Sequence, residues 1–188
     1  SRSRGNVNHL LSIRSSELAR LFQEEFERMW GDGPGGEQNS QFGRGKNSSG
    51  VQAVQVNGIP VNVLFAPHSK KSPEHGLLLI HEQLAAARRS IDMALFVFSD
   101  QSLANVLAEQ MAAHVDIRLL ADPGFASRSF SEVLDLLGVE LPDRLCKLEA
   151  GNRPFKTPLE TVGTPRLDEG DKLHHKFAVI DNKTVITG

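Results

Sequence analysis

The chain ends on LHHKFAVIDNKTVITG, residues 173–188, and this stretch decides the fold of its second half. Side chains alternate between the two faces of a strand, so His174 and Lys176 are expected on one face and His175 on the other. The next four residues, FAVI, are apolar on both faces, which is typical of a strand covered on both sides. Asp181 begins a predicted turn into a neighbouring strand, TVIT.

Helices and strands are predicted to alternate upstream of this stretch. Apolar residues recur at helical spacing over 77–89 and 99–113, while SIDMALFVF (90–98) and VDIRLLA (115–121) read as strands. Ser129 and Glu132 predict a capping box for a short helix that ends at Leu137. This alternation predicts an α/β fold, with a mixed, mostly parallel sheet flanked by helices. Four prolines interrupt residues 138–170, which are expected to form a long loop.

The first third of the chain reads as a separate set of elements. HLLSI (9–13) is expected to be a strand, and Ser15 or Ser16 can cap the helix that follows. Residues 31–50 are rich in Gly, Ser, Asn and Gln, which predicts a flexible linker. Residues 51–65 predict two strands around a tight turn at Asn57-Gly58. The expected core stripe of the helix comprises Leu18, Phe22, Phe26, Met29 and Trp30.

The overall composition excludes several classes of function. The 188 residues carry a net charge of −2, so any polyanion must be bound by a local cluster of cations. The single cysteine, Cys146, excludes an intramolecular disulfide and a zinc site with several cysteines. The cysteine usage fits a reducing compartment such as the cytoplasm. The chain shows no initiator Met, so we expect the true N-terminus, and any targeting signal, to lie upstream of Ser1.

The end of the last predicted strand pair carries unusual chemistry. A buried ammonium is costly unless an anion lies beside it, so the face of His174 and Lys176 suits a negatively charged ligand. A strand end from which Lys176 reaches into water explains the same residues without a ligand. The spacing favours the ligand. His174, Lys176, Asp181 and Gly188 fit H-x-K-x4-D-x6-G, which resembles the HKD motif of the phospholipase D superfamily.

The resemblance covers most of the chain. Residues 75–188 are similar to one repeat of the superfamily, with ARRSIDMALFVFSD (87–100) as its first strand and VDIRLLADPG (115–124) as its second strand and loop. GNVNHLLSIRSSELARLFQEEFERMW (5–30) resembles the strand and helix that follow an HKD motif in a preceding repeat. The implied segments are a repeat tail (1–30), a flexible linker (31–50) and an HKD-bearing repeat (51–188) truncated after Gly188.

The resemblance implies a phosphodiesterase that acts on phospholipid or nucleic acid through a covalent phosphohistidine, without a metal or cofactor. It implies that His174 is the general acid and that Lys176 binds the phosphate oxygens, with Asp181 completing the catalytic set by orienting it. Gly188 is expected to approach the phosphate, and Arg128, in the loop after a strand, is a further candidate to bind it. Many relatives carry Glu at the position of Asn8, where it supports the catalytic histidine of its own repeat.

Other readings remain open on the sequence. A truncated, non-catalytic binding or scaffold module would carry a single motif without activity. One motif works only with a second histidine, from the preceding repeat in the same chain or from a second subunit, so these 188 residues alone are expected to be inactive. A zinc hydrolase is disfavoured by the lone cysteine and by scattered histidines without metal-ligand spacing.

Overall fold

The computed structural model describes residues 5–32, 39–69 and 71–188. The chain forms two compact units, one of residues 11–79 and one that combines residues 1–10 with 80–188. The division into repeat tail, linker and repeat stays a prediction, because spatial contacts do not report which segments share a repeat. Residues 33–38 of the predicted linker lie outside the described residues.

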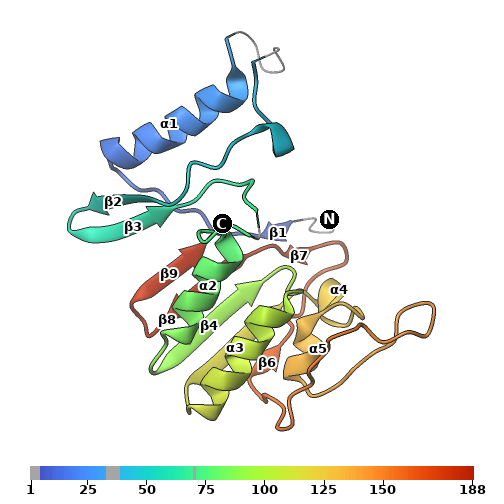
Figure 1. Ribbon diagram of the computed structural model, residues 1–188. Coiled ribbons are helices and arrows are strands. Elements are labelled where there is room, and N and C mark those ends of the chain that lie inside the picture. The colour runs from blue at the N-terminus through green and yellow to red at the C-terminus, as the bar shows by residue number, and fades with distance from the viewer. Residues whose placement is uncertain (1–4, 33–38, 70) are drawn as a thin grey trace. The chain divides into compact units, whose positions relative to one another are not determined.

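The larger unit is built on a five-stranded mixed sheet (Figure 1). Its strands are β4 (Ser90–Leu95), β5 (Asp116–Ala121), β6 (Val162–Gly163), β8 (Lys176–Ile180) and β9 (Thr184–Thr187), in the order β6-β5-β4-β8-β9. The β4–β5 and β5–β6 pairings are parallel, and the β4–β8 and β8–β9 pairings are antiparallel. The predicted α/β fold with a mixed sheet is confirmed, but the expectation that this sheet is mostly parallel is wrong, because two of its four strand pairings are antiparallel.

Four helices accompany this sheet: α2 (Gly76–Ala85), α3 (Gln101–Ala112), α4 (Pro123–Ala126) and α5 (Glu132–Leu136). Figure 1 shows α3 lying along the sheet, and its Leu107 is fully buried together with Ile91 of β4 and Leu119 of β5. Burial alternates strictly along β5, because the helices cover one face of that strand. None of the helices in the described part of the chain is long and apolar enough to cross a membrane.

The expectation that the last strand is covered on both faces is wrong. Ala178 and Ile180 of β8 are buried, whereas Phe177 and Val179, on the other face, are partly exposed. β5 of the same sheet shows the same asymmetry, with Leu120 48% exposed between buried residues. An apolar run therefore did not distinguish a strand buried on two faces from one buried on a single face.

Several predicted boundaries also differ from the structure. The predicted strand at residues 9–13 is wrong, because the strand of this region is β1 (Asn6–Val7), which pairs in parallel with β7 (Lys172–Leu173). The predicted loop after β5 opens with helix α4, where Asp122 accepts a hydrogen bond from the Gly124 amide. Helix α5 begins after Ser131 without a side-chain cap, so the predicted capping box is wrong. Residues 138–170 are irregular as predicted, apart from the two residues of β6.

The smaller unit packs helix α1 (Ser16–Trp30) on a hairpin of β2 (Gln52–Val56) and β3 (Ile59–Val63). Ser15 caps the helix through the Leu18 amide, and the Asn57-Gly58 turn has positive φ at both residues, as predicted. The predicted core stripe is wrong for three of its members. Phe22, Phe26 and Trp30 are 54%, 51% and 43% exposed. The buried positions of the helix are instead Leu18, Leu21 and Glu25.

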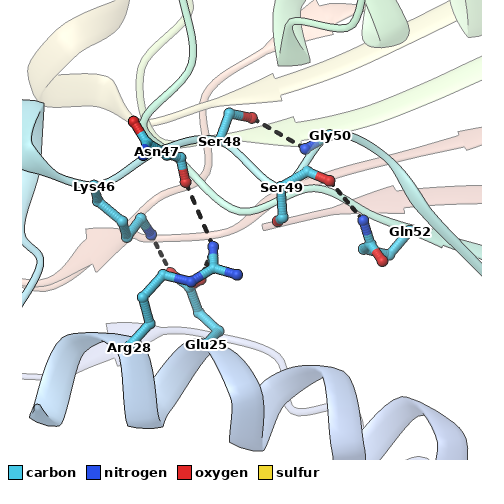
Figure 2. A network of polar contacts seen from close by, with 8 residues as sticks. All are labelled: Glu25, Arg28, Lys46, Asn47, Ser48, Ser49, Gly50 and Gln52. Atoms are coloured by element: carbon cyan, nitrogen blue, oxygen red, sulfur yellow. Dashed lines mark hydrogen bonds and ion pairs between the residues drawn. The ribbon is translucent and has the colours of Figure 1, made fainter.

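A buried ion pair joins Glu25 of α1 to Lys46, near the C-terminal end of the predicted linker (Figure 2). Lys46, directly after a 3-10 turn at Gly43–Gly45, donates to Glu25, and both side chains are buried. Arg28 lies 3.6 Å from the second oxygen of Glu25 and donates to the Asn47 carbonyl at 3.4 Å. Glu25 therefore occupies a core-facing position on α1 because a cation reaches it there.

Candidate active site at the start of strand β8

His174 and His175 link two short strands, β7 and β8, and the backbone around them is tied on both sides. The His174 amide donates to the Val7 carbonyl at 3.0 Å, and the Phe96 amide donates to the His175 carbonyl at 2.8 Å. Just before them, the Leu173 amide donates to the fully buried carboxylate of Asp122 at 2.9 Å. The position of His174 is thus set by backbone bonds to β1 and to the end of β4.

Lys176, the first residue of β8, reaches back to His174. Its Nζ lies 3.2 Å from Nδ1 and 3.3 Å from Nε2 of the imidazole, and it donates to the His174 carbonyl at 3.0 Å. Phe96 lies beneath both groups, with its ring centroid 4.7 Å from the imidazole and 5.3 Å from the ammonium. Lys176 is exposed. His174 and Lys176 thus present one proton-transfer group and one cation to solvent, and both groups pack against the apolar ring of Phe96.

Asn8 approaches the same imidazole from the N-terminal segment. Its Oδ1 lies 3.1 Å from Nδ1 of His174, a distance at which the amide oxygen accepts the ring N–H. In relatives this position supports the histidine of its own repeat, whereas here Asn8 lies beside His174. β1 pairs with β7, and this parallel pairing places Asn8 beside the histidine of the later segment.

Asp181 is not brought to this pair. It lies at the other end of β8, where its carboxylate accepts hydrogen bonds from the amides of Arg88, Arg89 and Ser90 at 2.7–3.1 Å. The bonds from the Ser90 and Arg89 amides lower the pKa of Asp181. This carboxylate fixes the turn after β8 to the start of β4. It can therefore affect the orientation of His174 and Lys176 only indirectly, by holding strand β8 in place.

The two remaining predicted phosphate contacts differ in their surroundings. The Gly188 amide donates to the Lys176 carbonyl at 3.4 Å, which keeps the end of β9 beside the lysine. Arg128 is exposed and its Nε donates to the Gly124 carbonyl of helix α4 at 3.1 Å.

The family comparison matches this half of the chain. A family model described as cardiolipin synthase, phospholipase D-like domain, matches residues 80–188, the segment that holds His174, Lys176 and Asp181. The chain belongs to the phospholipase D-like family. The resemblance drawn from the HKD spacing is therefore confirmed.

Relatives of this phospholipase D-like chain include three proteins called mitochondrial cardiolipin hydrolase. The identity is 29% over 108 residues with the protein of Xenopus laevis, covering 56% of this chain and 40% of the relative. It is 28% over 124 residues for Xenopus tropicalis, covering 65% and 46%. For Mus musculus it is 25% over 138 residues, covering 72% and 52%. The chain thus spans about half the length of the curated relatives it matches.

Two solved structures are also similar. NucT from Helicobacter pylori matches with a TM-score of 0.42 and 16% identity, over 60% of this chain and 64% of that one. The phospholipase D family member Nuc from Salmonella typhimurium matches with a TM-score of 0.40 and 20% identity, over 62% and 65%.

Sequence reasoning missed Phe96, and it singled out Asn8 without placing it beside His174. Both reach His174 through strand pairing across a long separation in sequence, and neither residue type carries a catalytic signature.

Among the described residues, no group of three or more His, Cys, Asp or Glu side chains could hold a metal ion. A surface depression of about 450 Å³ lies at the other end of β4 and β5, around Asp92 and Arg118.

Proposed function

We propose that this chain supplies one half of an active site that hydrolyses phosphodiesters, with His174 transferring protons and Lys176 binding the phosphate. The observation that carries this proposal is the approach of Lys176 Nζ to both ring nitrogens of His174, at 3.2 and 3.3 Å. Two groups this close can contact the same phosphate group. The ammonium then neutralises a non-bridging oxygen, while the imidazole reaches the bridging oxygen. Asn8, 3.1 Å from Nδ1, holds the ring so that Nε2 exchanges the proton.

The proposed reaction has two displacements. A histidine of a second H-x-K motif attacks phosphorus, so that an N–P bond forms while the P–O bond to the leaving alkoxide breaks and His174 protonates that alkoxide. Water then attacks phosphorus and gives its proton to His174 as the N–P bond breaks, which returns both histidines to their starting forms. Lys176 stabilises the charge that accumulates on the phosphate oxygens in both steps. Neither a metal nor another cofactor takes part.

The second histidine is proposed to come from a preceding repeat or from a second subunit. The alternative is a non-catalytic binding or scaffold module, which is supported by the single complete HKD motif, H-x-K-x4-D-x6-G, in this sequence. The two readings differ in one observable. A catalytic half gains activity when a second motif is present, whereas a scaffold module stays inactive in every assembly.

The proposed substrate is a phosphodiester of a phospholipid or of a nucleic acid. The relatives named mitochondrial cardiolipin hydrolase favour a lipid. The net charge of −2 also gives no general field that would attract nucleic acid. The local cation at Lys176 is compatible with either substrate.

The test compares three substrates on the complete protein: cardiolipin vesicles, single-stranded DNA and single-stranded RNA. We expect hydrolysis of at least one of them, loss of turnover in His174→Asn, and an acid-labile phosphoryl group trapped on histidine during turnover of the wild type. His114→Asn, at an exposed position after α3, is the matched control. Wild-type rates in His174→Asn would contradict the assignment, and inactivity of the wild type in every assembly would favour the scaffold reading.

A further inference from the structure

Two further histidines meet beside the proposed active site. His9 Nδ1 lies 3.1 Å from His175 Nδ1, and His9 Nε2 lies 2.7 Å from the Thr187 hydroxyl. The two rings are 23° from parallel, with centroids 5.3 Å apart. Because the nitrogens are much closer than the centroids, the rings meet edge to edge, as a hydrogen bond between them requires. We call His9, His175 and Thr187 the histidine clasp.

The clasp continues the pairing that brings Asn8 to His174. Asn6 and Val7 pair with Lys172 and Leu173 in the β1–β7 ladder. Asn8 then contacts His174 and His9 contacts His175, each pair 166 residues apart. The backbone bond from the His174 amide to the Val7 carbonyl holds the residue before Asn8. The clasp holds the residue after it.

Protonation decides whether the clasp can form. A hydrogen bond between two ring nitrogens needs one N–H and one lone pair, so two doubly protonated rings place two N–H groups face to face. Burial lowers the pKa of His175, and so do the charges of His9 and Lys176. All three effects favour the neutral form of His175. Around the pair, the β1 segment contributes His9, β8 contributes Lys176 and β9 contributes the uncharged Thr187. Lys172 of β7 lies beside Gly124 of α4 instead.

We propose that the histidine clasp is a positioning device that holds Asn8 against His174 and releases it when both clasp histidines are protonated. The inference rests on the proposed function, because the orientation of His174 matters for turnover only if His174 reacts. His9 and His175 are positioning residues, since they are proposed to act on His174 through the placement of Asn8. Phe177, with its ring 5.4 Å from each clasp imidazole, packs against both edge-on.

The direction of the pH effect follows from the lowered pKa of His175. A histidine whose pKa is lower in the folded state adds stability above its ordinary value of about 6.5 and loses it as the pH falls through the folded value. The clasp therefore orders the segment at Asn8 and His9 at neutral pH and loosens it in acid. We therefore expect the rate of turnover to fall with decreasing pH more steeply than protonation of a single group would cause.

The first test does not depend on activity. Imidazole ¹⁵N–¹H NMR of the complete protein reports the tautomer and the titration of each ring. We expect His175 to titrate below its ordinary value, and His9→Ala to shift the ring signals of both His174 and His175. His114→Asn should leave those signals in place. Titration of His175 at its ordinary value, with unchanged His174 and His175 signals in His9→Ala, would overturn the clasp.

The second test measures turnover of bis(p-nitrophenyl) phosphate between pH 5 and pH 8. We expect His9→Ala to lower kcat roughly three- to tenfold with little change in KM, as for the loss of one positioning hydrogen bond. His9→Asn, whose amide can bond to Thr187 or His175 without titrating, should recover part of kcat and flatten the acidic limb. An unchanged kcat and pH profile in His9→Ala would refute the positioning role. If the wild type hydrolyses no phosphodiester, the proposed function fails, while the NMR experiment still decides whether the clasp exists.

Discussion

At the residue scale, the two ends of strand β8 carry different chemistry. Lys176, at its start, lies against the imidazole of His174, whereas Asp181, after its end, accepts three backbone amides. A strand rises about 3.3 Å per residue, so the residues from 176 to 181 place these groups well beyond direct contact. The motif therefore combines a histidine–lysine pair at one end of the strand with a carboxylate that anchors the other end.

Removing the ammonium should affect the transition state more than the fold. Lys176→Ala is expected to lower kcat about 10²–10³-fold, because an exposed lysine adds little to stability while a charge aimed at the phosphate stabilises the transition state by about 2–4 kcal/mol. Steady-state kinetics and the thermal midpoint measure the two effects. Lys183→Ala, in the exposed turn after β8, is the matched control. A fall in stability without a fall in kcat would show that Lys176 is structural.

The carboxylate of Asp181 should act on stability in a pH-dependent way. Its pKa is lowered in the folded state, so its contribution is present above its ordinary value of about 3.9 and is lost as the pH falls through the folded value. Asp181→Asn, which suits the positive φ of 54° at this position, is expected to lower the thermal midpoint at pH 7. The wild type and the variant should converge only as the pH falls from about 3.9 through the lowered folded pKa. Asp168→Asn in the long loop is the control, and an equal gap at every pH would refute the charge effect.

At the scale of elements, helix α1 shows that apolar spacing does not choose the buried face. The helix has two candidate stripes, and the hairpin packs against the one with Leu18, Leu21 and Glu25. Glu25 is accommodated because Lys46 meets it inside, although acidic residues are seldom buried. A partner distant in sequence thus reversed the choice that hydrophobicity alone would make.

The two stripes of α1 can be distinguished by matched substitutions. Leu21 is 5% exposed and packs against the hairpin, so Leu21→Ala should lower the free energy of unfolding by about 2–5 kcal/mol. Phe26 is 51% exposed and contacts Trp30 within the same helix, so Phe26→Ala should cost less than about 1 kcal/mol. Urea titration of both variants gives the comparison. The opposite ranking would restore the aromatic stripe as the core.

Helix α5 carries a buried carboxyl with the opposite pH dependence to Asp181. Burial and then the charge of Asp135 raise the pKa of Glu132 to about 7, and Glu132 is 3% exposed. The folded state thus favours the protonated form, so its stabilisation is complete below about pH 4.5 and is lost as the pH rises through about 7. Glu132→Gln should stabilise the protein at pH 8.5 by about 1–3 kcal/mol and have little effect at pH 4.5. Chemical denaturation at both values checks this, and a destabilised variant at pH 8.5 would exclude a neutral Glu132.

At the scale of the whole molecule, the proposed reaction depends on the number of complete HKD motifs in the assembly. This sequence contains one complete HKD motif, with His174, Lys176 and Asp181, and the proposed reaction uses two histidines. We expect a verified monomer of these 188 residues to be inactive, and any activity to rise with the fraction of dimer. Light scattering beside a phosphodiesterase assay measures both quantities. Turnover by the monomer would require a nucleophile other than a second motif histidine.

The sequence by itself determined the family, the mixed α/β architecture and the closeness of His174 and Lys176. Each rests on local rules: the HKD spacing, the alternation of strand and helix patterns, and the two-residue period of a strand. The Asn57-Gly58 hairpin and the Ser15 cap also followed, because turn and cap chemistry involve neighbours in sequence.

Only the tertiary structure decided which distant residues meet. The pairing of β1 with β7 brings Asn8 to His174 and His9 to His175 across 166 residues, and no local preference encodes that register. The same holds for Glu25 and Lys46, whose burial depends on each other. The physical reason is that backbone ladders and ion pairs between remote segments are chosen by the packing of the folded chain, whereas a motif records only the spacing of its own residues.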